Sequence, residues 1–246
     1  MSSDRAGTLA RPEDLVDVAA LVTAYYTEQP DPEDPDQQVV FGTSGHRGSS
    51  LRKAFNDAHI AATTQAIVEY RAGQGITGPL YIGKDTHALS LPAWKTAIEV
   101  LVANGVTVLA ERDEDYTPTP AVSRAIVVHN AANSGPQADG IVVTPSHNPP
   151  RDGGFKYNPP HGGPADSDAT SVIAARANAL LADPGDIKRS SYEKVAGDVT
   201  RFDYLGRYCE DLVNALNLDA IREAGVHIGA DPMGGAAGMA PPVTPL

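Results

Sequence analysis

Helix-like and strand-like segments alternate along residues 39–182, and this alternation constrains the fold more than any other feature. Helical spacing of apolar residues predicts helices over residues 56–71, 90–104, 121–129 and 166–182. Short runs rich in β-branched residues predict strands at residues 80–82, 106–109, 139–143 and around Phe155. We place Ser90 at the N-cap of the second helix, and Gly73 where the first helix stops. Because such an alternation packs helices against a sheet, we expect a layered α/β fold.

The two ends of the chain carry different patterns. A helix is predicted over residues 13–26, with one apolar face formed by Leu15, Val18, Val22 and Tyr26. Residues 28–38 contain three prolines among acidic residues, which is typical of a solvated linker. Another helix is expected from Asp203, with Leu205, Cys209, Leu212 and Leu216 on one face and Cys209 in the core, before a strand at residues 226–230. We therefore divide the chain into residues 1–38, 39–202 and 203–246.

Composition excludes several functional classes. The net charge of −12 and the pI of about 4.9 disfavour binding to nucleic acid or to anionic membranes, because phosphate groups would repel the protein. Cys209 is the only cysteine, so the chain has no internal disulfide and no cysteine-rich zinc site. No signal peptide and no long apolar run is evident, and we expect a cytoplasmic protein. The sequence leaves the oligomeric state open.

The segment Thr144-Pro145-Ser146-His147-Asn148-Pro149 is the strongest functional candidate. It follows the apolar run of residues 139–143, so the serine is expected in a turn at the carboxyl end of a strand, where open α/β sheets place their chemistry. Prolines on both sides restrict the backbone and hold the hydroxyl on a stiff loop. An ordinary surface turn has the same residue types, so this segment alone does not decide the function.

Two further segments carry phosphate-binding chemistry. Residues 41–48 (Phe-Gly-Thr-Ser-Gly-His-Arg-Gly) combine three glycines, which allow close approach of the backbone, with the forked donor of Arg47. Residues 153–158 (Gly-Gly-Phe-Lys-Tyr-Asn) place Lys156 on an expected return strand close to Ser146. Such a lysine can neutralise a phosphate or move a proton. Basic residues gather in or beside these loops, as expected of an electropositive cleft in an acidic protein: His46, Arg47, Arg52, Lys53, Lys84, His147, Arg151 and Lys156.

One glycine pattern resembles a nucleotide-binding motif but lies in the wrong structural context. Residues 73–78 match the dinucleotide fingerprint G-x-G-x-x-G, but a helix is predicted before them and a strand after them, which is the reverse of what nucleotide binding requires. No P-loop sequence is present. The Gly83-Lys84-Asp85-Thr86-His87 segment follows a strand, and Asp85 can stabilise its turn.

Together, these motifs resemble the α-D-phosphohexomutase family, most closely the α-D-glucose phosphate-specific phosphoglucomutases of bacterial type. Residues 42–48, 83–86, 144–149 and 154–158 occur in the family's order, and the resemblance covers about residues 10–236. It implies an α/β/α first domain with a mixed sheet, followed by the start of a second, similar domain. Many family members carry arginine where this chain has His87.

The resemblance also implies roles for individual residues. Ser146 would be the phosphorylated serine, whose phosphate ligates Mg²⁺, with His147 supporting the phosphoryl group and Lys156 acting as acid, base or electrostatic partner. Thr43, Ser44, His46, Arg47 and Asn148 would bind the substrate. The implied reaction interconverts α-D-glucose 1-phosphate and D-glucose 6-phosphate through glucose 1,6-bisphosphate.

The same resemblance sets expectations about what this chain lacks. The Asp-x-Asp-x-Asp metal loop of the family's second domain is absent, as are its third and fourth domains, so we expect the chain to be truncated and inactive alone. Phosphomannomutase or phosphoglucosamine mutase activity stays open, because the sugar-selecting residues would lie outside this sequence. A non-catalytic module that binds sugar phosphates is the alternative from another class.

Overall fold

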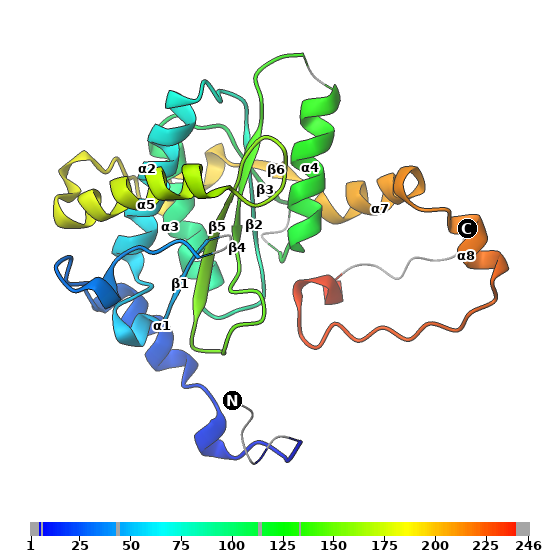
Figure 1. Cartoon of the computed structure of the whole chain (residues 1–246), viewed down its shortest axis with the longest axis horizontal. Helices are drawn as coiled ribbons and strands as arrows, with labels where there is room; N and C mark the ends of the chain where they lie inside the picture. The colour runs from blue at the N-terminus through cyan, green and yellow to red at the C-terminus, as the bar shows by residue number, and fades with distance from the viewer. Residues whose placement is uncertain (1–4, 6, 43–44, 113–114, 133, 240–246) are drawn as a thin grey trace.

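The protein is built around one mixed sheet. The computed structural model describes residues 5, 7–42, 45–112, 115–132 and 134–239 (Figure 1). The six strands lie in the order β1-β5-β4-β2-β3-β6. Their bounds are β1 His46–Gly48, β2 Leu80–Lys84, β3 Val108–Glu111, β4 Asp139–Val143, β5 Gly153–Asn158 and β6 Thr200–Phe202. Strands β4, β2, β3 and β6 are parallel, whereas β5 runs antiparallel to β4 and β1 antiparallel to β5.

Helices cover both faces of this sheet. Helices α2 (Asp57–Gly73), α3 (Ser90–Ala103) and α5 (Ser167–Ala182) lie on one side, and α4 (Thr119–Ala132) and α7 (Tyr204–Ala215) lie on the other (Figure 1). The remaining helices are α1 (Val18–Thr27), α6 (Tyr192–Val195) and α8 (Leu218–Glu223). Short 3₁₀ turns occur at Pro12–Asp14, Pro35–Gln37, Ser50–Arg52, Pro184–Asp186, Ala196–Asp198 and Ala236–Met239. The layered α/β/α prediction is therefore confirmed.

The two central strands are buried along their whole length. Every residue of β2 and β4 is buried, because helices cover both of their faces. Ile82 and Ile141 face the larger core beneath α2, α3 and α5, whereas Tyr81 and Val142 face the smaller core beneath α4. In the part of the chain that the structure describes, no helix is long and apolar enough to span a membrane.

A buried ion pair ties the amino end of β4 to α2. Arg71, in the last turn of α2, donates from Nε and Nη2 to the Asp139 carboxylate at 2.9–3.2 Å, and Nη2 also donates to the Gly78 carbonyl at 2.7 Å. The Tyr157 hydroxyl donates to the same carboxylate at 2.7 Å. Burial raises the pKa of Asp139, and Arg71 opposes that rise. All the strong partners of this carboxylate thus come from other elements.

The first helix differs from its prediction. It begins at Val18, where Asp17 caps it, and its buried residues are Leu21, Ala24 and Tyr25. Leu15, Val18 and Tyr26, predicted on the buried face, are about half exposed or more. The reason is tertiary: the Tyr25 hydroxyl donates to the Thr96 hydroxyl of α3 at 2.9 Å, which turns the neighbouring face inward.

Other corrections concern single elements. Leu89, not Ser90, is the N-cap of α3, and the Ser90 hydroxyl donates to the Asp85 carboxylate at 2.5 Å instead. Strand β3 starts at Val108, two residues later than predicted. Strand β6 is not predicted by the sequence, because its three residues, Thr-Arg-Phe, are few and two of them are polar.

The segment after residue 203 also departs from expectation. Helix α7 packs against α4 and places the buried Tyr204 in the smaller core, so it attaches to the first domain. Cys209, expected in the core, is only partly buried. Residues 226–230 form no strand in the structure as described, and Val226 and Ile228 are exposed. Sequence could place the helix at Asp203 but not the surface that receives it.

Candidate active site

Ser146 occupies a strained turn directly after β4. Its φ of 65° lies in the left-handed region, which non-glycine residues rarely adopt and which costs conformational energy. The Ser146 amide donates to the Thr144 hydroxyl at 3.0 Å, and the Asn148 amide donates to the Pro145 carbonyl at 3.4 Å. The turn therefore presents the exposed serine hydroxyl beyond the carboxyl end of the sheet.

Lys156 reaches this hydroxyl from the next strand. Strand β5 pairs with β4 so that Lys156 lies opposite Val142. The Lys156 ammonium donates to Ser146 Oγ at 2.7 Å. Burial lowers the pKa of Lys156, the charge of Arg47 lowers it further, and Asp85 raises it. A lysine of this kind releases a proton more readily than a fully solvated one.

Glycines make this close approach possible. A Cβ on Gly154 would lie 2.1 Å from the Thr144 carbonyl oxygen, so a larger residue would push β5 away from the serine turn. A Cβ on Gly45 would lie 2.4 Å from the Phe155 carbonyl oxygen and 2.7 Å from the Lys156 side chain. The glycines of both motifs thus serve the contact between these segments.

Arg47 lies beside Lys156 at the β1 edge. Strand β1 pairs Arg47 with Gly154, next to Lys156 on β5. The Arg47 Nε atom is buried and has no hydrogen-bond partner among the described residues. A buried donor left without a partner is unfavourable, and an anion bound there would satisfy it.

A loop after β2 borders the serine turn on its other side. The Asp85 amide donates to the Val143 carbonyl at 3.1 Å, and Asp85 Oδ1 accepts from the His87 amide at 3.0 Å. His87 Nε2 lies 2.8 Å from the Pro150 carbonyl oxygen, and the Thr86 hydroxyl donates to the Gly234 carbonyl at 2.7 Å. This loop thus contacts both the serine loop and the C-terminal segment.

These elements enclose a hollow of about 510 Å³ beside Ser146. Its walls come from the loop after β2, the start of α4, the serine turn and the C-terminal segment 232–237. Ser146 and Asn148 line it directly. The hollow is large enough for a phosphorylated sugar.

Comparisons with known proteins show the family of this chain. Residues 38–182 match the family model described as phosphoglucomutase/phosphomannomutase, alpha/beta/alpha domain I. The chain belongs to the phosphoglucomutase/phosphomannomutase family. A phosphoglucomutase of Komagataeibacter xylinus is 54% identical over 94% of this chain, and the match covers 42% of that relative.

Solved structures of similar proteins support the fold. The open form of the Paramecium phosphoglucomutase pp63/parafusin aligns with a TM-score of 0.67 at 23% identity, covering 85% of this chain and 40% of that one. A putative phosphomannomutase of Thermus thermophilus aligns with a TM-score of 0.59 at 24% identity, covering 78% and 38%. The chain thus spans less than half the length of each of these relatives.

The expected family residues do not all meet at the hollow. Ser146, Lys156 and Arg47 lie together, and Asn148 lines the hollow. His147 is exposed on the serine turn. Thr43 and Ser44 lie outside the described residues, so their expected roles in substrate binding remain predictions.

His46 does not fit direct contact with a substrate. Its side chain is 1% exposed and stacks against the rings of Phe55 and His59, with centroids 5.8 and 5.4 Å away. Strand alternation explains this, because His46 and Arg47 are neighbours and point to opposite faces. We therefore correct the expectation for His46 to a structural role beneath the site.

The burial of His46 predicts a loss of stability in acid. Burial lowers the pKa of His46 to about 3, and His59 acts in the same direction. Above pH ~6.5 both the folded and the unfolded states are neutral at this residue. Below that pH only the unfolded state gains the proton, so the free energy of unfolding falls by about 1.4 kcal/mol per pH unit towards pH 3. Urea unfolding at pH 7, 6, 5 and 4.5 measures this slope.

His46→Phe is the matched variant, because it keeps a ring between Phe55 and His59 but cannot titrate. As the pH falls, the free energy of unfolding of His46→Phe is expected to decrease less steeply than that of the wild type, by about 1.4 kcal/mol per pH unit, which corresponds to one proton. His59, whose pKa burial also lowers, should contribute the same slope in both proteins. Equal slopes in the two proteins would contradict the assignment.

Not all of the expected basic cluster faces the hollow. Lys84 is buried, lies over the rings of Tyr116 and Trp94 and donates to the Asp115 carbonyl at 3.1 Å. Arg52 pairs with Asp152, and Lys53 pairs with Glu28. Of this basic set, Lys156 thus contacts Ser146 directly, and Arg47 lies close enough to Lys156 to lower its pKa.

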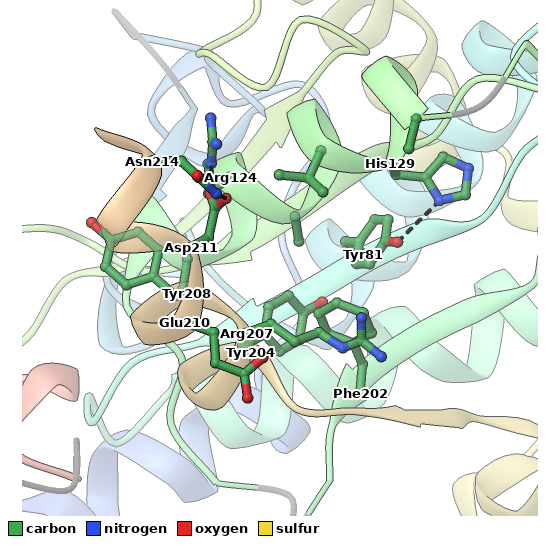
Figure 2. Close-up of a pocket in the computed structure, with 14 residues that line it drawn as sticks. Tyr81, Arg124, His129, Phe202, Tyr204, Arg207, Tyr208, Glu210, Asp211 and Asn214 are labelled. Atoms are coloured by element: carbon green, nitrogen blue, oxygen red, sulfur yellow. Dashed lines mark hydrogen bonds and ion pairs between the residues drawn. The ribbon is translucent and has the colours of Figure 1, made fainter. Parts of the chain in front are cut away.

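A second hollow of about 480 Å³ lies between α4 and α7, away from Ser146 (Figure 2). Tyr81, Phe202 and Tyr204 form its aromatic floor, and Arg124 forms an ion pair with Asp211 across it. The Tyr81 hydroxyl lies 3.1 Å from His129 Nδ1. Ser146, Lys156 and Arg47 do not line this second hollow, so it does not contain the residues expected to act in catalysis.

The described residues do not supply a magnesium site by themselves. They contain no group of three or more His, Cys, Asp or Glu side chains placed to hold a metal ion. Mg²⁺ requires near-octahedral oxygen ligands, and Ser146 would contribute only through a phosphate. The donor set in this part of the chain therefore does not fit Mg²⁺.

Proposed function

We propose that this chain forms the phosphoserine half of a phosphoglucomutase, which interconverts α-D-glucose 1-phosphate and D-glucose 6-phosphate. The observation that carries the proposal is the contact of 2.7 Å between Lys156 Nζ and Ser146 Oγ in a strained turn. The 54% identity to a bacterial phosphoglucomutase supports the choice of glucose phosphates. Glucose 1,6-bisphosphate is the proposed intermediate and activator.

In the proposed reaction, phospho-Ser146 gives its phosphoryl group to the free hydroxyl of the hexose phosphate. The bond between Ser146 Oγ and phosphorus breaks while the hydroxyl oxygen bonds to phosphorus. Lys156 protonates the departing Oγ, and the proton released by the sugar hydroxyl returns to the lysine through water. Glucose 1,6-bisphosphate then reorients in the site and returns its other phosphoryl group to Ser146 by the reverse steps.

The remaining expected residues take supporting roles in this proposal. Arg47 offers its unpartnered Nε to the phosphoryl oxygens, and His147 and Asn148 border the group from the serine turn. By the family resemblance, Thr43 and Ser44 would also bind the substrate. A phosphate on Ser146 would be one ligand of Mg²⁺, and the other ligands lie outside the described donor set, so no step is assigned to the metal.

We place the enzyme in the cytoplasm. A relative from Mesembryanthemum crystallinum, 33% identical over 54% of this chain, is named cytoplasmic phosphoglucomutase. We propose small sugar phosphates as the substrates of this chain, in keeping with the size of the hollow beside Ser146.

The test is phosphate transfer from glucose 1,6-bisphosphate to a fusion of this chain with the remaining part of the Komagataeibacter phosphoglucomutase, because the chain alone is expected to be inactive. Intact mass and peptide mapping should find one phosphate on Ser146. The fusion should also convert glucose 1-phosphate, with mannose 1-phosphate as the competing substrate. Phosphate on another residue, or faster turnover of mannose 1-phosphate, would overturn the corresponding part of the proposal.

Lys156 and Arg47 provide a graded prediction in that fusion. Each makes or offers a charged hydrogen bond to the phosphoryl group, so Lys156→Met or Arg47→Ala should cost about 1.5–3 kcal/mol, roughly ten- to more than a hundredfold in kcat/KM. Lys156→Met should affect kcat more, because it removes the proton donor. Lys194→Met, an exposed lysine on α6, is the control. Unchanged kinetics in both site variants would refute their convergence on one phosphate.

A further inference from the structure

His87 connects two loops that meet at the site, and sequence alone defines no role for it. It belongs to the loop after β2, yet its ring bonds to the far end of the serine loop. We propose that His87 is a positioning residue that holds the end of the serine loop, and through it Ser146, in place. This inference rests on the proposed function of Ser146, which it deepens.

The contacts of the His87 ring define its tautomer, that is, which ring nitrogen carries the hydrogen. The Leu89 amide donates to His87 Nδ1 at 3.1 Å, so Nδ1 is an acceptor and carries no hydrogen. The neutral ring then carries its hydrogen on Nε2, which donates to the Pro150 carbonyl at 2.8 Å. One nitrogen thus fixes the ring to its own loop, and the other holds the neighbouring loop.

The serine loop needs such a contact from outside. Pro145, Pro149 and Pro150 have no amide hydrogen, so the loop has few donors with which to stabilise itself. Its internal bonds include the Ser146 amide to Thr144 and the Asp152 amide to the Pro149 carbonyl at 2.9 Å. The left-handed backbone at Ser146 persists only where the surroundings hold it.

The loop after β2, which carries His87, is itself held by several hydrogen bonds. Asp85 accepts from the His87 amide and from the Ser90 hydroxyl, and its own amide donates to Val143 at the end of β4. A chain of contacts therefore runs from the ends of β2 and β4, through His87, to Pro150. Because a serine displaced by about 1 Å can lose about a hundredfold in rate, we expect this anchor to affect catalysis through the position of Ser146.

Two substitutions with amide side chains distinguish the two hydrogen bonds of the His87 ring. His87→Gln places an N–H group near the position of Nε2, so it keeps the bond to Pro150 and loses the one to Leu89. His87→Asn places an oxygen near Nδ1, so it keeps the bond to Leu89 and loses the one to Pro150. The variants have similar polarity and differ in which loop they hold.

Hydrogen exchange of the peptide covering residues 146–152 is measured on the purified chain, and the rate of Ser146 phosphorylation by glucose 1,6-bisphosphate is measured on the fused enzyme. In His87→Asn, exchange should rise and phosphorylation should fall, each by about three- to tenfold, with an unchanged Tm. His87→Gln should behave like the wild type in both measurements. A merely structural role would not produce this rescue, because both variants remove one hydrogen bond.

Equal behaviour of the two variants, or a larger effect in His87→Gln, would overturn the proposal. Exchange is measured on the unphosphorylated chain, so it does not depend on mutase chemistry. If the wild type takes up no phosphate on Ser146, the proposed function fails, and the positioning role fails with it even where exchange identifies His87 as the anchor.

Discussion

Ser146→Ala is expected to reduce the glucose phosphate mutase activity of the fused enzyme by more than about a thousandfold, because the phosphoryl group then has no acceptor on the protein. The fold should remain intact. The serine hydroxyl is exposed, and losing its hydrogen bond with Lys156 should lower the free energy of unfolding by no more than about 1.5 kcal/mol. Coupled assays of glucose 6-phosphate formation and urea unfolding measure the two effects.

Ser171→Ala is the matched control, since Ser171 is an exposed serine on α5, far along the chain from the turn. It should retain full activity and take up phosphate at Ser146 like the wild type. Residual activity of Ser146→Ala above about one tenth of the wild type, once host mutase has been excluded, would rule out the phosphoserine.

Arg71→Ala is expected to lower the free energy of unfolding by about 3–5 kcal/mol, because it leaves the Asp139 carboxylate buried without its cation. Both side chains are almost fully buried, at 6% and 0% exposure. Tyr157 would still donate to the carboxylate but cannot neutralise it. Urea unfolding monitored through Trp94, which lies in the larger core, measures the loss.

Arg176→Ala provides the comparison on the surface. Arg176 pairs with Glu69 at 2.6 Å, but both side chains are more than a third exposed, and such pairs contribute about 0–1 kcal/mol. If Arg71→Ala cost no more than Arg176→Ala, the buried pair would not anchor β4 to α2.

Local patterns determined most of the first domain. The apolar spacing of residues 56–71 predicted α2, whose buried residues include Ile60, Thr64 and Ile67. The run Asp139–Val143 is buried on both faces, which requires an almost entirely apolar strand and therefore leaves a clear sequence signal. The turn that follows it needs prolines and a serine, so it too could be located from sequence.

Contacts between different segments were predicted in one case and missed in others. The approach of Lys156 to Ser146 was predicted from a short return strand, and the structure places these side chains in contact. The burial of His46 was missed, because a histidine in a glycine-rich motif gives no sign of the ring stack that covers it. The link from His87 to Pro150 joins residues 63 positions apart and has no local signature.

The sequence by itself determined the order of helices and strands over residues 56–182 and the turn that carries Ser146, because periodicity, proline and glycine act on neighbouring residues. Tertiary structure decided which face of α1 is buried, that the three residues of β6 join the sheet, and that α7 docks on α4 through Tyr204. It also decided which basic residues reach the serine. Each of these outcomes depends on the surface that another element offers, and that surface exists only after the chain has folded.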